Sequence, residues 1–241
     1  MTALVEWDDV TKVFGSGHVQ VDALSHVSLQ ALRGELVAVM GPSGSGKSTM
    51  LSVAGGLDRP TSGRVVVDGE DLSTMGAAEL ALVRRRRVGY VFQQLNLIDG
   101  LTAEENISLP LELDGMSGRR ARSAARTTLA LVEMRDLAGR FPEELSGGEQ
   151  QRVAIARAVV GDRALLLADE PTGALDSSTG EAVLRLLRAQ CDRGACVILV
   201  THDARLAGWA DRVVFLRDGR IVDQTGPRSG PEVLLREPAR R

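Results

Sequence analysis

The sequence predicts an α/β fold with a parallel sheet, an antiparallel β layer and an inserted α-helical subdomain. Three observations support it. The first 40 residues form short segments rich in Val and Leu between turns that contain Gly, residues 77–158 are mostly helical in pattern, and the last third alternates apolar and helical segments. Strand–helix–strand alternation is typical of a parallel sheet covered by helices.

The predicted strands are short and apolar. The segment 164–168 contains almost no polar residue, which is typical of a parallel strand that is buried on both faces. The predicted strands cover residues 4–9, about 19–32, 35–40, 63–68, 88–92, 164–168, 196–201, 212–216 and 220–224.

The clearest predicted helix lies within residues 118–134. Its apolar residues, Ala121, Ala125, Leu129 and Val132, recur at three- and four-residue spacing, while arginines occupy other faces. This amphipathic pattern indicates a small helical layer. Further helices are predicted at about 47–55, 151–160, 178–190 and shortly after residue 203.

These elements predict one domain over residues 1–225, with the helical subdomain inserted at about 94–158. Residues 226–241 are rich in Pro, Gly, Arg and Glu, and we expect a loosely held tail there.

Composition excludes several classes of protein. The 29 Lys and Arg against 32 Asp and Glu give a net charge of −3, whereas a general nucleic-acid binder normally carries a basic excess. Cys191 and Cys196 lack metal-site spacing and are expected to be reduced core thiols of a cytosolic protein. We expect no signal peptide, and no apolar run approaches the ~20 residues that span a bilayer. Any membrane role is therefore expected to come through a partner chain.

Residues 41–49, GPSGSGKST, match the pattern G-x-x-x-x-G-K-[ST] between a predicted strand and a predicted helix. Glycines leave backbone N–H groups free to surround a triphosphate, and the helix N-terminus adds a favourable dipole. Lys47 is expected to bridge the β- and γ-phosphates, and Ser48 to bind Mg²⁺. The loop therefore predicts a P-loop NTPase (RecA-like) core. Its predicted nucleotide-binding residues are Gly41, Ser43, Gly44, Ser45, Gly46, Lys47, Ser48 and Thr49.

Two acidic residues, Asp169 and Glu170, follow the apolar strand 164–168. Open α/β sheets bind ligands at the carboxyl ends of their strands. Asp169 is expected to hold Mg²⁺ through water, and Glu170 to act as the general base that polarises the attacking water. The alternative is that the pair only ends a strand and caps the next helix.

Residues 145–150, LSGGEQ, precede the predicted helix 151–160 and resemble the signature motif of ABC (ATP-binding cassette) ATPases. Ser146, Gly147 and Gly148 at a helix start would offer hydroxyl and amide donors to a second anion. Glu149 replaces the commoner Gln of LSGGQ. Taken alone, a Gly-Gly pair before a helix is an ordinary turn.

Other motifs follow in the order of the same family. Gln93 looks like the Q-loop glutamine, Asp176 in Ala174–Asp176 like the D-loop aspartate, and His202 like the switch histidine. Phe14 stands where the family carries an aromatic residue that stacks on adenine. The resemblance covers roughly residues 4–225.

The resemblance implies an ATPase that uses ATP and Mg²⁺ and works as a homodimer. Two chains would sandwich two ATP molecules head to tail, with the signature of one copy on the γ-phosphate held by the other. Its catalytic residues would be Glu170, His202 and Gln93, its metal ligands Ser48, Gln93 and Asp169, and its remaining nucleotide-binding residues Phe14, Ser146, Gly147, Gly148, Glu149 and Asp176.

Residues 91–111 resemble the subgroup that serves lipoprotein release, macrolide efflux and cell division (MacB, LolD and FtsE type), and residues 141–144 look like those of separate ATPase subunits. That implies an integral membrane permease of the FtsX/MacB type on another chain. It also implies a cytoplasmic location on the inner face of the membrane, with no nucleic acid as partner. The apolar residues within 95–101 would form a groove for the permease or fill the helical layer. The run Arg84–Arg87 would be a solvated helix end or a membrane or partner contact.

Three other functions fit parts of the sequence. A soluble ABC ATPase on ribosomes or DNA is the main alternative, although ribosomal types carry two cassettes and DNA-repair types a long coiled coil. A GTPase or small-molecule kinase would not need the LSGGE run, and the chain has no NKxD motif. A non-catalytic ATP binder would need neither Glu170 nor His202.

Overall fold

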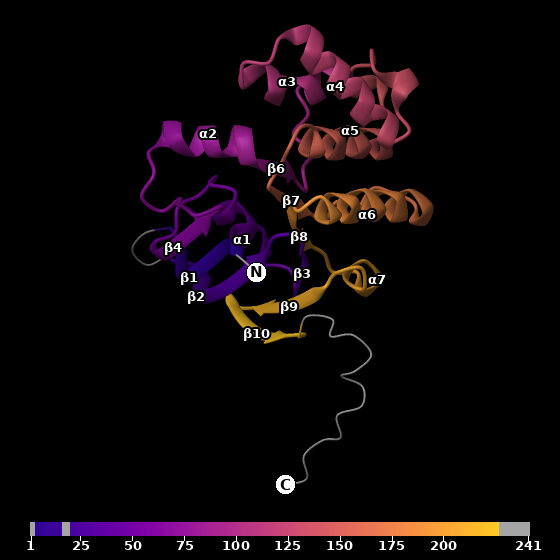
Figure 1. Cartoon of the computed structure of the whole chain (residues 1–241). Coiled ribbons are helices and arrows are strands. Elements are labelled where there is room, and N and C mark those ends of the chain that lie inside the picture. The colour runs from indigo at the N-terminus through magenta and orange to yellow at the C-terminus, as the bar shows by residue number, and fades with distance from the viewer. Residues whose placement is uncertain (1–2, 16–19, 227–241) are drawn as a thin grey trace.

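The computed structural model describes residues 3–15 and 20–226 and contains two sheets and a helical layer (Figure 1). It confirms the predicted α/β class. The larger sheet has the strand order β10-β9-β3-β8-β7-β6, and the smaller has the order β2-β1-β4-β5. Helices α3, α4 and α5 lie together at one end of the molecule, and the smaller sheet lies near the other (Figure 1).

The larger sheet is parallel except at one edge. Its parallel strands are β9 (Arg212–Arg217), β3 (Leu36–Met40), β8 (Cys196–Val200), β7 (Leu165–Asp169) and β6 (Val88–Val91), and β10 (Arg220–Gln224) pairs antiparallel with β9. Alternate residues of β3, β7 and β8 belong to different hydrophobic cores, so both faces of the sheet are covered.

One core lies between this sheet and the antiparallel sheet. The smaller sheet comprises β1 (Ala3–Phe14), β2 (Val21–Leu32), β4 (Ser62–Val67) and the short β5 (Glu70–Asp71). Helix α1 (Lys47–Ala54) contributes Met50, Leu51, Val53 and Ala54 to this core. The core therefore holds the helix that follows the glycine-rich loop.

The other face of the sheet packs against α5 (Gly147–Val159), α6 (Ser177–Asp192) and α7 (Ala204–Ala207). Helix α5 also contributes to a third core, with α3 (Ala103–Leu113) and α4 (Gly118–Leu131). Helix α2 (Ala77–Arg87) and the short 3₁₀ turns η1 (Arg135–Leu137) and η2 (Pro142–Glu144) complete the described elements. The limits 94 and 158 of the helical subdomain stay a prediction.

Several boundaries differ from the sequence prediction. Strand β1 continues past Asp9 to Phe14, because a bulge with Asp9 at φ 52° lets pairing with β2 resume. Helix α5 begins at Gly147 instead of residue 151, because Ser146 and Glu149 form a capping box. Residue 19 and, apart from Gly226, the predicted tail lie outside the described residues.

Cys191 and Cys196 are buried free thiols, as predicted. Burial raises the pKa of Cys191 to about 12 and also raises that of Cys196. Within residues 3–15 and 20–226, no helix has the length and apolar character needed to cross a membrane.

Candidate functional site

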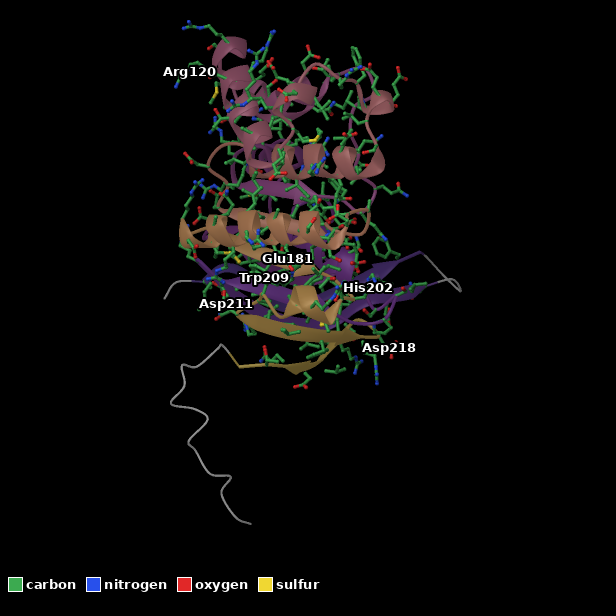
Figure 2. The ribbon with its side chains drawn as sticks, turned by 90° about the vertical axis from the view of Figure 1, so that its right-hand side faces the viewer. Arg120, Glu181, His202, Trp209, Asp211 and Asp218 are labelled. Atoms are coloured by element: carbon green, nitrogen blue, oxygen red, sulfur yellow. The ribbon has the colours of Figure 1, made fainter. Side chains whose placement is uncertain are left out.

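Four neighbouring parallel strands end at the predicted site. In the sheet order β3-β8-β7-β6, these strands are followed by the glycine-rich loop, His202, Glu170 and Gln93 respectively. The pairing of Val200 with both Val39 and Asp169 aligns the ends of the first three strands. Sheet pairing therefore brings residues from distant parts of the sequence to one edge, and Figure 2 shows His202 on one side of the molecule.

The glycine-rich loop is packed too closely for side chains at two positions. A Cβ at Gly46, whose φ is 100°, would overlap the Ala23 carbonyl oxygen, and a Cβ at Gly41 would overlap the Leu216 carbonyl oxygen. At Gly44, with φ 79°, a Cβ would meet nothing within 4 Å. The loop is thus pressed against β2 and β9 on one side and open at Gly44.

Polar groups gather around this loop. Lys47 Nζ donates to the carbonyl oxygens of Gly41 at 2.9 Å and Pro42 at 2.8 Å. Ser45 Oγ is buried and has no hydrogen-bond partner among the described residues. An unsatisfied buried hydroxyl in a loop of glycines fits the binding of a phosphate oxygen. Ser43, Ser48 and Thr49 lie in the same loop or the first turn of α1.

Asp169 is buried at the end of β7. Burial raises the pKa of its carboxyl, and the charge of Glu170 adds to this, while the Ser48 hydroxyl and Lys47 lower it. Among the described residues no group of three or more His, Cys, Asp and Glu side chains could hold a metal ion. Mg²⁺ usually takes one or two protein oxygens together with substrate phosphates and water. The oxygens of Ser48 and Asp169 fit that role.

Glu170 and His202 form a contact between the ends of β7 and β8. His202 Nδ1 lies 2.8 Å from Glu170 Oε1. The Glu170 side chain is 18% exposed, whereas that of His202 is 79% exposed. Glu170 has φ 48°, and its N–H donates to the Val200 carbonyl oxygen at 3.0 Å. A non-glycine residue in the left-handed region next to a binding edge is typical of a functional site.

Gln93 is exposed and begins a loop that two other residues hold. The Asn106 side chain bonds to the Ile98 N–H and donates to three carbonyl oxygens, those of Ile98, Leu101 and Thr102. Arg157 donates to the carbonyl oxygens of Leu95 and Asn96. Asn106 and Arg157 are not among the predicted site residues. No sequence motif marks either residue, because both donate to backbone carbonyl oxygens.

The structure shows one of the two predicted roles for the apolar residues of this loop, packing in the helical layer. Leu97 packs against the core of the helical layer, whereas Ile98 is 44% exposed. The loop therefore fills the layer in part and leaves an apolar side chain at the surface.

The signature residues form an exposed helix start. Ser146 Oγ accepts a hydrogen bond from the Glu149 N–H at 3.3 Å, and Glu149 Oε2 accepts one from the Ser146 N–H at 2.7 Å. The Ser146 N–H and, to a smaller extent, the Ser146 hydroxyl lower the pKa of the Glu149 carboxyl. A Cβ at Gly147 would meet nothing within 4 Å, whereas one at Gly148 would lie 3.4 Å from the Ala174 carbonyl oxygen. The signature and the D-loop of one chain are therefore neighbours.

Asp176 caps its own helix. Its carboxylate accepts hydrogen bonds from the backbone N–H and the hydroxyl of both Ser178 and Thr179, which strongly lower its pKa. This local role, which the sequence analysis did not predict, accounts for an aspartate at this position without a ligand.

Phe14 ends β1 and is 42% exposed, and the ammonium of Lys12 lies 4.7 Å from its ring centroid. Lys12 is not among the predicted site residues.

The arginine run at the end of α2 is bonded within the chain, so neither predicted role describes it fully. The partners tie α2 to the loop after α1, to the β4–β5 turn and to the end of α3. Arg84 donates to the Gly56 carbonyl oxygen, Arg85 and Arg86 donate to Asp114, and Arg87 donates to Asp68 and Glu70.

Known proteins resemble this chain over nearly its whole length. A family model described as ABC transporter matches residues 24–173. An uncharacterized ABC transporter ATP-binding protein of Thermotoga maritima is 46% identical over 221 residues, which are 92% of this chain and 94% of that protein. The macrolide export ATP-binding/permease protein MacB of Brucella melitensis is 45% identical over 234 residues, which are 96% of this chain and 36% of that protein. The chain thus spans about a third of the length of that relative.

The solved structures agree. A dimeric post-hydrolysis structure of the ATP-binding cassette MJ0796, bound to ADP and Pi, has a TM-score of 0.90 and 43% sequence identity. The similarity covers 93% of this chain and 99% of that chain. Since the family model matches more than half of the chain and the Thermotoga relative is matched almost end to end, the chain belongs to the ABC transporter family of ATP-binding cassettes.

Proposed function

We propose that this ABC ATPase closes as a homodimer around two ATP molecules and drives an integral membrane permease of the FtsX/MacB type on a separate chain. The work done would be export, lipoprotein extraction or the transmission of mechanical force. The observation that carries the proposal is the presence of two helix starts suited to anions, Gly46 at α1 and Ser146 at α5. One copy needs only the helix start at Gly46 to hold its own triphosphate, so the helix start at Ser146 is free to bind the triphosphate of another copy.

Within one copy, the carboxyl ends of strands β3, β8, β7 and β6 would bind ATP and prepare its hydrolysis. We call this region the strand edge. Lys47 would leave its two loop carbonyl oxygens for the β- and γ-phosphates. Mg²⁺, held by Ser48, Asp169 and Gln93, would neutralise charge on those phosphates. Glu170 would accept a proton from the attacking water, and His202 would hold the Glu170 carboxylate in place.

The second helix start would act on the partner copy. Ser146, Gly147 and Gly148 are at the exposed end of α5, where N–H groups and a helix dipole favour a γ-phosphate from the opposing chain. Gly148 lies near the Ala174 carbonyl oxygen, and this proximity would bring Asp176 of the D-loop to the same interface. The dimeric form of the related cassette MJ0796 supports this arrangement.

Closure and opening would follow from the shared phosphate. ATP joins the two copies because each γ-phosphate would contact both, and hydrolysis would remove that contact. The open and closed forms would differ in their affinity for ATP and for its products. The free energy of this difference would drive a conformational change in a partner.

A groove beside the Gln93 loop is our candidate for the permease contact. Its volume is about 250 Å³, and it lies between the end of α1, strand β6 and the helical layer. Leu57, Phe92 and Pro110 contribute apolar surface, and Arg84 and Arg157 also line it. Such a groove suits a short amphipathic helix of a membrane partner at the inner face of the cell membrane. The Thermotoga relative, an ABC transporter ATP-binding protein matched over 94% of its length, supports a role in a transporter.

The dimer is tested by the ATPase rate per molecule as a function of protein concentration. A composite site predicts a rate per molecule that falls steeply on dilution, and a constant rate would contradict it. The permease is tested by detergent extraction and pull-down of the intact complex. A co-purified integral membrane protein supports the proposal, whereas ribosomes or DNA would support a soluble ABC ATPase instead.

A further inference from the structure

The chain contains only two lysines, Lys12 and Lys47, among its 29 basic residues, and all the others are arginines. Lys47 belongs to the glycine-rich loop. Lys12 lies two residues before Phe14 on β1. An ammonium is a compact charge with three donors, and a planar guanidinium does not replace it in a confined site. A lysine at position 12 therefore indicates that this position, near Phe14, requires a compact ammonium group.

Lys12 is held on three sides. Its Nζ donates to Asp58 Oδ1 at 3.1 Å and to the Arg59 carbonyl oxygen at 2.9 Å, and it lies 4.7 Å from the centroid of the Phe14 ring. The side chain is only 13% exposed. Two donors are thus satisfied by oxygen atoms, and the face of the ring is the remaining partner of the ammonium.

Phe14 lies close to the glycine-rich loop. It pairs with Val21 on β2, and two residues further along β2 the carbonyl oxygen of Ala23 packs against Gly46. Two strand residues correspond to about 7 Å. A nucleotide whose phosphates occupy the loop would therefore have its base near the Phe14 ring.

We propose that Lys12 is a positioning residue that presents one face of the Phe14 ring to the purine of the bound nucleotide. The ammonium occupies one ring face, so the purine stacks on the other. A ring that is 42% exposed gains a fixed orientation from this contact, which lowers the entropy lost on stacking. The cation also draws electron density from the ring, which reduces its repulsion of an electron-rich base. The inference rests on the proposed function, since it requires a nucleotide at this site.

The anchors of Lys12 link the two ends of the nucleotide site. Asp58 and Arg59 lie in the loop that follows α1, and the glycine-rich loop precedes the same helix. The platform for the base and the cradle for the phosphates are therefore both tied to α1. This arrangement keeps their separation fixed before a nucleotide arrives.

The test compares a ligand that has a base with one that lacks it. Isothermal titration calorimetry would measure the Kd of ADP and of pyrophosphate, neither of which needs the hydrolytic step. Lys12→Met should raise the Kd of ADP about two- to fivefold, the factor that corresponds to a partly exposed cation–π contact, and leave that of pyrophosphate unchanged. In a Phe14→Leu background the same substitution should have no further effect on ADP.

Arg64→Met is the matched control, because Arg64 lies on strand β4 of the same sheet and pairs with the exposed Asp8. It removes one positive charge and should change neither Kd. If Lys12→Met unfolds the chain, Asp58→Asn weakens the anchor and should raise the Kd of ADP alone by a smaller factor.

Three results would overturn the inference: an unchanged Kd for ADP, an equal loss for both ligands, or a loss that persists without Phe14. A wild-type chain that bound neither ligand would instead overturn the proposed function, and this inference with it.

Discussion

The strand edge and the start of α5 are both suited to phosphate, but they are built in opposite ways. The strand edge takes Lys47, Asp169, Glu170 and His202 from three segments that only sheet pairing brings together. The start of α5 uses Ser146 and Glu149 of a single turn, and these two residues satisfy each other. Carboxyl groups at the strand edge are buried or half-buried, whereas Ser146 and Gly147 are exposed.

From this difference we expect chemistry at the strand edge and assembly at the start of α5. A buried edge with a perturbed carboxyl and a left-handed glutamate has the features of a reacting centre. An exposed helix start whose own residues cap it is stable without a ligand and can still bind an anion. Substitutions at the edge should therefore remove binding or turnover within one copy, and substitutions at the helix start should remove association between copies.

The largest effect is expected for Glu170→Gln. Loss of a general base costs about 10²- to 10⁴-fold in rate, while the isosteric amide leaves the phosphate contacts in place. We expect turnover to be abolished and an ATP-bound dimer to accumulate, as measured by phosphate release and size-exclusion chromatography. Hydrolysis near the wild-type rate would refute the assigned role and the division between the two regions.

Lys47→Ala should act earlier, on binding itself. Charge-assisted hydrogen bonds contribute about 1.5–3 kcal/mol, so the Kd of ATP should rise about 10- to 100-fold. Equilibrium titration with a fluorescent ATP analogue would measure it. An unchanged affinity would mean that the glycine-rich loop does not hold the triphosphate.

The sequence predicted the elements that carry the strand edge better than their local details. The end of the apolar strand 164–168 located Asp169 and Glu170, and the resemblance to the ABC family located His202. The capping of α6 by Asp176 and of α5 by Ser146 and Glu149 was not predicted. The same residue types can bind a ligand or cap a helix, and the motif alone does not separate the two roles. Asn106, Arg157 and Lys12 were missed because their partners are distant in sequence or are backbone carbonyls that no motif displays.

Gly147→Ala separates stability from association at the start of α5. The position is helical and open, so alanine should stabilise the monomer by up to about 1 kcal/mol, or roughly 2–4 °C in Tm. The added methyl group lies where a partner's phosphate would approach, so ATP-dependent dimerisation should weaken while monomer affinity for ATP stays constant. Calorimetry and analytical ultracentrifugation would measure both. A variant that dimerised normally would exclude this helix start from the interface.

The smallest effect is the pH dependence that His202 adds at the strand edge. The hydrogen bond to Glu170 raises the pKa of His202 above its ordinary value of about 6.5, whereas the pKa of Glu149 at the start of α5 is lowered. A raised pKa in the folded chain means that the pair stabilises the fold fully below pH of about 6.5, and that this contribution is lost as the pH rises through the raised value. Glu170→Gln should return the pKa of His202 toward its ordinary value and flatten this slope. The chain has three histidines, so NMR titration can follow the His202 ring directly. A His202 pKa that did not change in Glu170→Gln would show that the pair does not form in solution. The contact between His202 and Glu170 would then no longer distinguish the strand edge from the start of α5.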